Sequence, residues 1–277
     1  MLGKLIKYEF KDTYKLFCLY YAILAVLTVL GAITVRSSEF IPSTILTIIM
    51  ALTMIAYIIM MWILGLITIM ALCSRFNKTM YGDRGYLTHT LPVTKASLLA
   101  SKYIVAIVWC IASVAVMFLS VMIFGSFLSG ENLFTSLIFE ISHAKWQALD
   151  EECREVLGCG LVSIAVLTII ALIVIVMHLL SFLWASISIG QLANEKRRLL
   201  SIFAGIGLWF VEFLLKRLVQ PETYSTVVDG LANLRLGNGP ILHFDQALLI
   251  TIAAELAFFA IETLLIWFIS SKRLNLA

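Results

Sequence analysis

The run VLGCGLVSIAVLTIIALIVIVMHLLSFLWASISIGQLAN, from Val156 to Asn194, decides the fold. It contains 39 residues and no Asp, Glu, Lys or Arg. A membrane-spanning helix needs about 20 mostly apolar residues. No Gly or Pro interrupts the run between Gly160 and Gly190, so two crossings and a turn do not fit comfortably. We therefore expect one long spanning helix, placed at about 156–190.

The composition of the whole chain favours the bilayer as its solvent. Of the 277 residues, 61% are hydrophobic and 13% are charged, and the mean hydropathy is +1.01. Soluble domains carry about 45–50% apolar and about 25% charged residues. These values exclude a soluble globular domain and a disordered chain. The five cysteines show no metal-type spacing, and whether Cys153 and Cys159 pair is left open.

The remaining charge-poor runs complete a six-span arrangement. With an inside N-terminus, the inner connections hold 14 of the 20 basic residues, as the positive-inside rule requires. We expect an all-α integral membrane protein of six transmembrane helices, a single domain over 1–277 with both termini cytoplasmic. The other five predicted spans are about 16–35, 40–74, 103–130, 199–219 and 247–271.

Two segments outside the spans have an interfacial pattern. Residues 2–15 place apolar side chains at helical spacing and lysines on other faces, which predicts an amphipathic helix in the inner membrane interface. The alternative is a merely charged flank of the first span. Between residues 131 and 155, the apolar set from Leu133 to Trp146 predicts an outer interfacial helix, with solvated surface as the alternative.

Three intramembrane carboxylates are candidate functional residues. Glu255 and Glu262 are seven residues apart and share one helix face, and Glu212 lies at a similar depth in its own span. Such groups are costly in hydrocarbon and usually face a bundle interior or a wet cavity. We expect all three in a transport path that favours cationic cargo. Alternatively, Lys216 neutralises Glu212 from one turn away, whereas Glu255 and Glu262 have no local partner. His178 lies alone in the middle of its span, which favours a packed, hydrogen-bonded histidine over a ligand or a proton relay.

Enzymatic motifs are missing from the sequence. It contains no phosphate-binding G-x-x-x-x-G-K-[ST] loop, no H-E-x-x-H and no G-x-S-x-G. We therefore expect no catalytic residue, bound cofactor or metal site in this chain, and no nucleic-acid partner.

Two stretches resemble a known family. The opening MLGKLIKYEFK and the run GDRGYLTHTLPVTKASLLASK, residues 82–102, are similar to permease subunits of bacterial ATP-binding-cassette exporters of the second exporter type. Related permeases export bacteriocins, lantibiotics and peptide toxins, including phenol-soluble modulins. The resemblance implies a homodimer, or a pair of related permeases, in the bacterial cytoplasmic membrane. Two copies of a separate ATPase subunit would carry ATP and Mg²⁺ and drive export of amphipathic or cationic peptides, or of drugs.

The resemblance also assigns roles to two segments. In that family the inner loop after the second span, here 75–102, holds a coupling helix seated in a groove of the ATPase. The matching residues lie within 82–91, and we expect Asp83, Arg84, Tyr86 and Leu87 to make the coupling contacts. Segment 2–15 would be the connecting helix. The longest non-spanning segment has about 30 residues, far fewer than the 100–200 of a typical domain, so the ATPase is expected on another chain.

Two other functions remain open at this stage. A secondary transporter or channel would use the three glutamates for protons or cations, although the halves of the sequence show no inverted repeat of the kind common in such proteins. A membrane-anchored sensor or assembly factor would carry no cargo at all.

Overall fold

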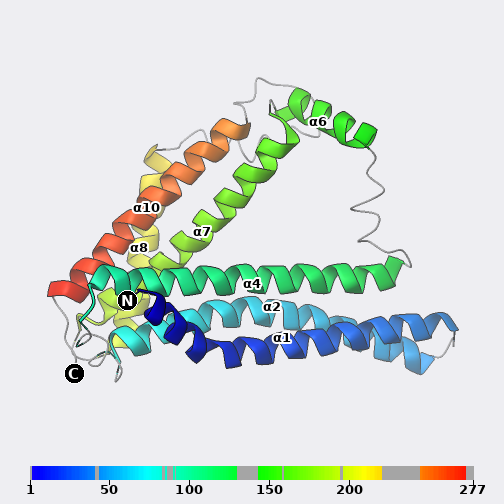
Figure 1. The fold of residues 1–277 in the computed structure, drawn as a ribbon, viewed down its shortest axis with the longest axis horizontal. Coiled ribbons are helices and arrows are strands. Elements are labelled where there is room, and N and C mark those ends of the chain that lie inside the picture. Colours follow the sequence, from blue (N-terminus) through cyan, green and yellow to red (C-terminus); the bar gives the residue numbers. More distant parts are fainter. Residues whose placement is uncertain are drawn as a thin grey trace. The chain divides into compact units, whose positions relative to one another are not determined.

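The computed structural model describes residues 2–40, 44–82, 85, 90, 92–129, 143–157, 159–193, 196–219 and 244–272. Over these residues the protein is all-helical, with seven helices and no strand (Figure 1). The helices are α1 (Leu2–Phe40), α2 (Thr44–Met80), α4 (Lys95–Ser129), α6 (His143–Leu157), α7 (Leu161–Gly190), α8 (Arg197–Val219) and α10 (Phe244–Lys272).

Six of these helices are long and apolar enough to cross a membrane, and α6 is the exception. The prediction of six spans is therefore confirmed. The deciding run contains one long continuous helix, α7, as expected, but α7 begins at Leu161 and residues 156–157 end α6. Helix α2 continues six residues past the predicted end of the span at residue 74, and in these last turns Phe76 packs on Trp184 of α7.

The chain divides into two compact units. Unit 1 comprises Met1–Leu72 and Ser97–Ser142, and unit 2 comprises Cys73–Ala96 and His143–Ala277. Unit 1 therefore contains α1 and most of α2 and α4. Unit 2 contains the last turns of α2, the start of α4, and helices α6, α7, α8 and α10.

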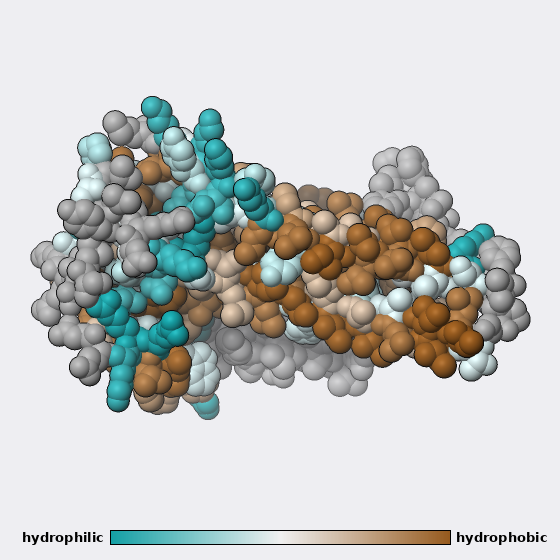
Figure 2. All heavy atoms as spheres, turned by 90° about the horizontal axis from the view of Figure 1, so that it is seen from below, coloured by the Kyte–Doolittle hydropathy of each residue, from teal (hydrophilic) through white to brown (hydrophobic). Residues whose placement is uncertain are grey.

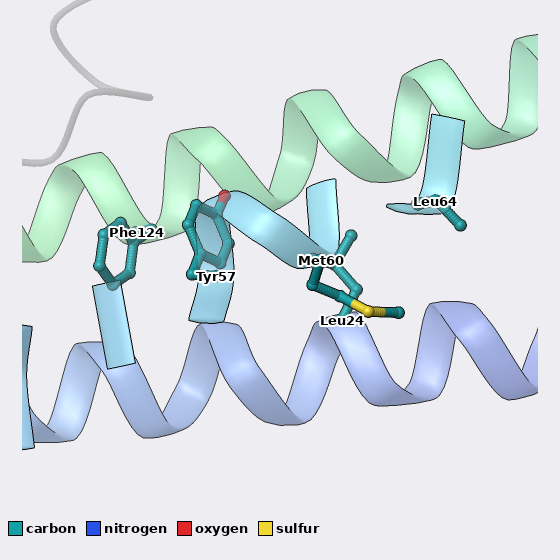
Figure 3. Packing of buried hydrophobic residues seen from close by; sticks show 5 residues of the cluster. All are labelled: Leu24, Tyr57, Met60, Leu64 and Phe124. Carbon is teal, nitrogen blue, oxygen red and sulfur yellow. The ribbon is translucent and has the colours of Figure 1, made fainter. Parts of the chain in front are cut away.

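In unit 1, hydroxyl contacts fix the register of the three helices. Tyr21 and Thr28 of α1 hydrogen-bond to Ser113 and Ser120 of α4, over 2.8 and 2.7 Å. The constant offset shows that α1 and α4 run parallel. Thr68 and Tyr57 of α2 reach the same two serines in the opposite order, so α2 is antiparallel to both. The core between them contains Leu24, Tyr57, Met60, Leu64 and Phe124 (Figure 3).

The outer surface of these helices is apolar. Figure 2 shows hydrophobic side chains over most of the length of the α1–α2–α4 unit, with hydrophilic residues gathered at its ends. Large side chains such as Trp62, Met70 and Val114 are more than 60% exposed. Burying so much apolar surface needs lipid, since an exposed apolar belt of this extent is unfavourable in water.

The N-terminal turns of α1 are continuous with the first span, with no helix break at Lys15. They pack along α4, where the Phe10 ring stacks on Trp109 at 4.7 Å and Lys102 forms a 2.6 Å ion pair with Glu9. The Trp109 indole N–H donates to the Thr13 hydroxyl over 2.8 Å. The first four turns are therefore fixed to α4 by aromatic and polar contacts.

In unit 2, small residues bring α7 and α8 close together. A Cβ at Gly190 would lie 1.8 Å from Ser201 Oγ and 2.8 Å from the Arg197 carbonyl oxygen, so only glycine fits there. A Cβ at Gly205 would meet Ser186 at 3.5 Å. None of the described side chains of α8 is fully buried, so this helix lies on the rim of its unit.

Helix α6 leads into α7 through a charged cap. The Asp150 carboxylate accepts the Leu161 backbone N–H over 2.7 Å and the Arg154 guanidinium N–H over 2.9 Å. The Leu161 N–H bond, reinforced by Arg154, lowers the pKa of Asp150. Cys153 and Cys159 do not form a disulfide. The predicted outer helix from Leu133 falls largely outside the described residues; the part that is described belongs to α6.

Candidate functional site

The three predicted glutamates converge on His178. The imidazole Nδ1 contacts Glu255 Oε2 from α10. On the other side of the ring, Nε2 lies 3.4 Å from Glu212 Oε2 of α8 and 3.6 Å from Glu262 Oε1 of α10. Three helices thus supply one site. His178 is buried and packed, as expected, but it is not alone, because three glutamates surround it.

The packing pattern of α7 and α10 explains why these side chains meet. Buried residues of α7 recur at alternating steps of three and four, the spacing that keeps one helix face toward its neighbours. His178 occupies one of these positions, and Glu255 and Glu262 lie on the packed face of α10. The positions on α7 are Ala171, Val174, His178, Ser181, Ala185 and Ser188.

Lys216 of α8 joins the site from one turn beyond Glu212. Its ammonium lies 2.8 Å from Glu255 Oε1 and 4.0 Å from Glu212 Oε2, and 5.2 Å from the centroid of the Phe258 ring. Glu255 has no local partner on α10 here, as expected, and its partner Lys216 reaches it from α8. The predicted pairing within α8 is present but is the longer of the two contacts.

Glu262 is the most deeply buried of the carboxylates, at 4% exposure. The Ser181 hydroxyl of α7 donates to its Oε2 atom. Its partners therefore come from α7 and not from its own helix. Spacing within one helix identifies only neighbours three or four residues away, so it could not predict these contacts from a serine and a histidine of another helix.

We call His178, Glu212, Lys216, Glu255 and Glu262 the ionisable cluster. Their side chains are between 5% and 22% exposed, and Val174 and Ile252 of an apolar cluster lie about one helical turn from His178 and Glu255. With a neutral imidazole, three carboxylates and one ammonium leave a formal charge of −2. With an imidazolium the formal charge is −1. Charges in such surroundings interact more strongly than in water, so in either state the net negative charge favours a cation as a ligand.

Part of the cluster has the donor set of a metal site. One ligand atom each from His178, Glu212 and Glu262 can be chosen so that all three lie within 4.8 Å of one another. This is the group that the search for metal motifs in the sequence missed, because its members come from three helices. The available signal was chemical: three carboxylates at one membrane depth need a cationic or donor partner, and His178 is the one histidine in the longest charge-free run of the sequence.

The predicted coupling residues Asp83, Arg84, Tyr86 and Leu87 lie outside the described residues. The flanks of their loop are described, however. On the α2 side, the Phe76 ring stacks on Trp184 of α7 at 4.5 Å, with 4° between the planes. The Gln191 side-chain amide donates to Asn77 Oδ1 over 3.2 Å. The last turns of α2 are therefore packed against the C-terminal part of α7.

The other flank of the loop contacts α10. The Lys95 ammonium at the start of α4 donates to the Ser270 carbonyl oxygen over 2.7 Å. Close to the first flank, burial raises the pKa of Tyr81 to about 12, so this phenol is neutral at physiological pH. Both ends of the loop thus contact helices that carry members of the ionisable cluster.

The residues and their geometry are the basis for any assignment of function to this site. Comparisons of the chain with protein-family models, with curated proteins and with solved structures found no match.

Proposed function

We propose that this chain is the transmembrane subunit of an ATP-driven exporter, energised by a separate ATPase subunit. The cargo would be amphipathic or cationic peptides, such as toxins and antimicrobials, or drugs. The observation that carries the proposal is that both flanks of the loop contact helices α7 and α10, within unit 2. Phe76 packs on α7 and Lys95 bonds to α10, and these two helices hold His178, Glu255 and Glu262.

This attachment provides a mechanical route from an ATPase to the membrane interior. Trp184 is six residues from His178, about 9 Å along α7, and Ser270 is eight residues from Glu262, about 12 Å along α10. A push on the loop would displace both helices as rigid elements. Packed helices tend to switch between discrete arrangements rather than deform continuously, which suits alternating access.

The topology that the proposal requires follows from the charge distribution. Six spans place both termini on one side of the membrane, and the basic residues favour the cytoplasmic side. Segment 2–15 would lie at the inner interface, with its exposed lysines toward anionic headgroups. The proposed location is the bacterial cytoplasmic membrane, and the proposed assembly is a permease homodimer on two ATPase subunits.

The ionisable cluster gives the exporter a cation-attracting site in the membrane. Glu212, Glu255 and Glu262 would lie along the transport path and change exposure between the two states. A site accelerates transport only if its affinity for the cargo differs between these states. Displacement of α7 and α10 by the loop would supply that difference.

Co-purification with the ATPase subunit tests the proposal. The wild-type chain should retain the ATPase through affinity purification, and cationic peptide should stimulate ATP hydrolysis by the complex. Arg84→Glu should weaken this association, whereas Lys145→Glu, in α6 at the opposite end of the predicted topology, should not. If Arg84→Glu keeps both the association and the stimulated hydrolysis, the coupling assignment is wrong.

A second candidate function is a proton- or cation-coupled secondary transporter, which the ionisable cluster itself favours. Proton relays in such proteins are built from intramembrane Glu and His residues. The two candidates differ in their energy source. Transport by the purified chain alone, driven by a pH or cation gradient, would support the second candidate over the first.

A further inference from the structure

We propose that the ionisable cluster binds one divalent transition-metal ion of the Zn²⁺ type, held by His178 Nε2 and by carboxylate oxygens of Glu212 and Glu262. This inference goes beyond the proposed function and does not rest on it. It concerns the affinity of the chain itself for an ion, with or without an ATPase.

The spacing of the three donor atoms fits a small four-coordinate ion. Zinc bonds of about 2.0–2.1 Å to nitrogen and oxygen, arranged tetrahedrally, place neighbouring ligand atoms about 3.3 Å apart. The observed separations from His178 Nε2 are 3.4 Å to Glu212 and 3.6 Å to Glu262. An ion could enter with only small side-chain movements, and its fourth position would be left to water or another ligand.

The donors are oriented by the groups that usually support metal ligands. A ligating histidine generally gives its second ring N–H to a carboxylate. Here His178 Nδ1 contacts Glu255, which is itself paired with Lys216 over 2.8 Å. This arrangement directs the Nε2 lone pair toward Glu212 and Glu262. The Ser181 hydroxyl binds one oxygen of Glu262 and leaves the other facing His178.

Unpartnered buried atoms are the independent sign of a ligand. Neither His178 Nε2 nor Glu262 Oε1 has a hydrogen-bond partner among the described residues, and the same holds for Glu212 Oε1. Glu262 is 4% exposed as a residue and its side chain 5% exposed. Buried polar atoms are nearly always paired. His178 Nε2 and Glu262 Oε1 face each other at 3.6 Å without a hydrogen bond, which indicates that a further species completes the site.

Charge and donor type identify that species. The cluster with a neutral imidazole has a formal charge of −2, which one divalent cation neutralises. Imidazole favours Zn²⁺ and other first-row transition metals over Mg²⁺. Mg²⁺ requires near-octahedral oxygen ligation and keeps several waters, to which a donor set of one imidazole and two carboxylates is poorly suited.

The ion would also bind α8 to the rest of unit 2. Helix α8 contributes Glu212 but has no fully buried side chain among its described residues. Coordination would therefore add the strongest contact between α8 and the α7–α10 pair. The position of α8 would become dependent on the ion.

Binding of Zn²⁺ to the full purified chain tests the proposal. The protein, in detergent with its affinity tag removed and previously treated with chelator, is titrated with Zn²⁺ by calorimetry. We expect one saturable site per chain, undisturbed by excess Mg²⁺. Glu262→Gln and His178→Gln should lower the affinity at least tenfold, and Glu255→Gln by about 10- to 100-fold through loss of orientation.

Two controls separate this site from other binding. Glu152→Gln in α6 should bind as the wild type does, and so should a Cys153→Ser/Cys159→Ser variant, which excludes zinc held by thiolates. Size-exclusion profiles and helical circular dichroism establish that each variant is folded. Because cluster variants can misfold, the wild-type chain is also loaded with Co²⁺. Visible absorption bands of a low-symmetry four-coordinate ion, without a thiolate charge-transfer band, are expected.

The Zn²⁺ titrations test the proposed ion site independently of any ATPase subunit. Absence of a saturable Zn²⁺ site in the wild type would overturn it and leave the cluster as an ion-pair network. Unchanged affinity in folded Glu262→Gln would also overturn it. Association with the ATPase can succeed or fail in either case, so failure of the proposed function is read separately.

Discussion

Within each unit, polar side chains link neighbouring helices, and the kind of side chain differs between the two units. In unit 1 the polar contacts between helices are mostly neutral hydroxyls, and in unit 2 they are mostly ionisable groups. Ser120 of α4 joins Thr28 and Tyr57 over 2.7 and 3.0 Å, and each hydroxyl has a partner. Hydroxyl pairs of this sort stabilise helix association in membranes modestly and without charge.

The polar contacts within unit 2 are mostly between ionisable groups and are incompletely paired. The ionisable cluster places three carboxylates within reach of His178, yet leaves buried oxygen and nitrogen atoms without hydrogen bonds. Buried ion pairs are weak contributors to stability when compared with apolar packing. The comparison therefore teaches that paired hydroxyls hold the helices of unit 1 together, whereas the buried polar atoms of unit 2 are incompletely paired, which the proposed ion would explain.

The largest effect should come from His178→Leu. It leaves three glutamates without their common partner, and removing one member of a buried ionic network costs about 3–5 kcal/mol. The free energy of unfolding in mixed detergent micelles, measured in the presence of chelator, should fall by that amount. Thr168→Leu, an exposed position of α7, is the matched control. A His178→Leu chain as stable as this control would break the distinction between the units.

The next effect should come from Gly190→Ala. The added Cβ would lie 2.8 Å from both the Arg197 carbonyl oxygen and Ser201 Cα, so backbone must move. Overpacking of this kind costs about 1–3 kcal/mol. Gly207→Ala, where no atom lies within 4 Å of the new Cβ, should be neutral or stabilising. Equal unfolding energies for the two variants would show that α8 does not pack closely on α7.

A smaller effect is expected for Ser120→Ala in unit 1. It removes two contacts between helices, each worth about 0.6 kcal/mol on average in membrane proteins, so the loss should be about 1 kcal/mol. Ser37→Ala, whose hydroxyl bonds only within its own helix in the contacts seen here, serves as the control. If Ser120→Ala lowered the free energy of unfolding as much as His178→Leu, hydroxyl contacts and charged contacts would contribute equally to stability.

The smallest effect lies outside the apolar helices, at Asp150. Its lowered pKa means that its contribution to stability is present above the ordinary aspartate pKa and is lost as pH falls through the lowered folded value. Hydrogen exchange at the Leu161 amide, corrected for intrinsic rates, should accelerate only at acidic pH. Asp150→Asn should show weaker protection already at neutral pH, and equal protection in both chains would remove the cap.

The spans were predictable because charge-free runs directly report the need to cross about 30 Å of hydrocarbon. The C-terminal end of α2 was harder to predict. Its last turns pack on α7 through Phe76, and no local sequence pattern encodes that contact. The shared depth of Glu212 and Glu255 followed from residue counting. Their partners did not, because Lys216, Ser181 and His178 reach them across helices, and such contacts depend on packing rather than on sequence spacing.

The most direct test of the account is transport by reconstituted vesicles. Inside-out proteoliposomes containing the chain and its ATPase subunit should accumulate a fluorescent cationic amphipathic peptide only when ATP is present. Glu255→Gln with Glu262→Gln should reduce that uptake while the ATPase remains bound. Uptake by the chain alone, without nucleotide or any companion protein, would contradict the account.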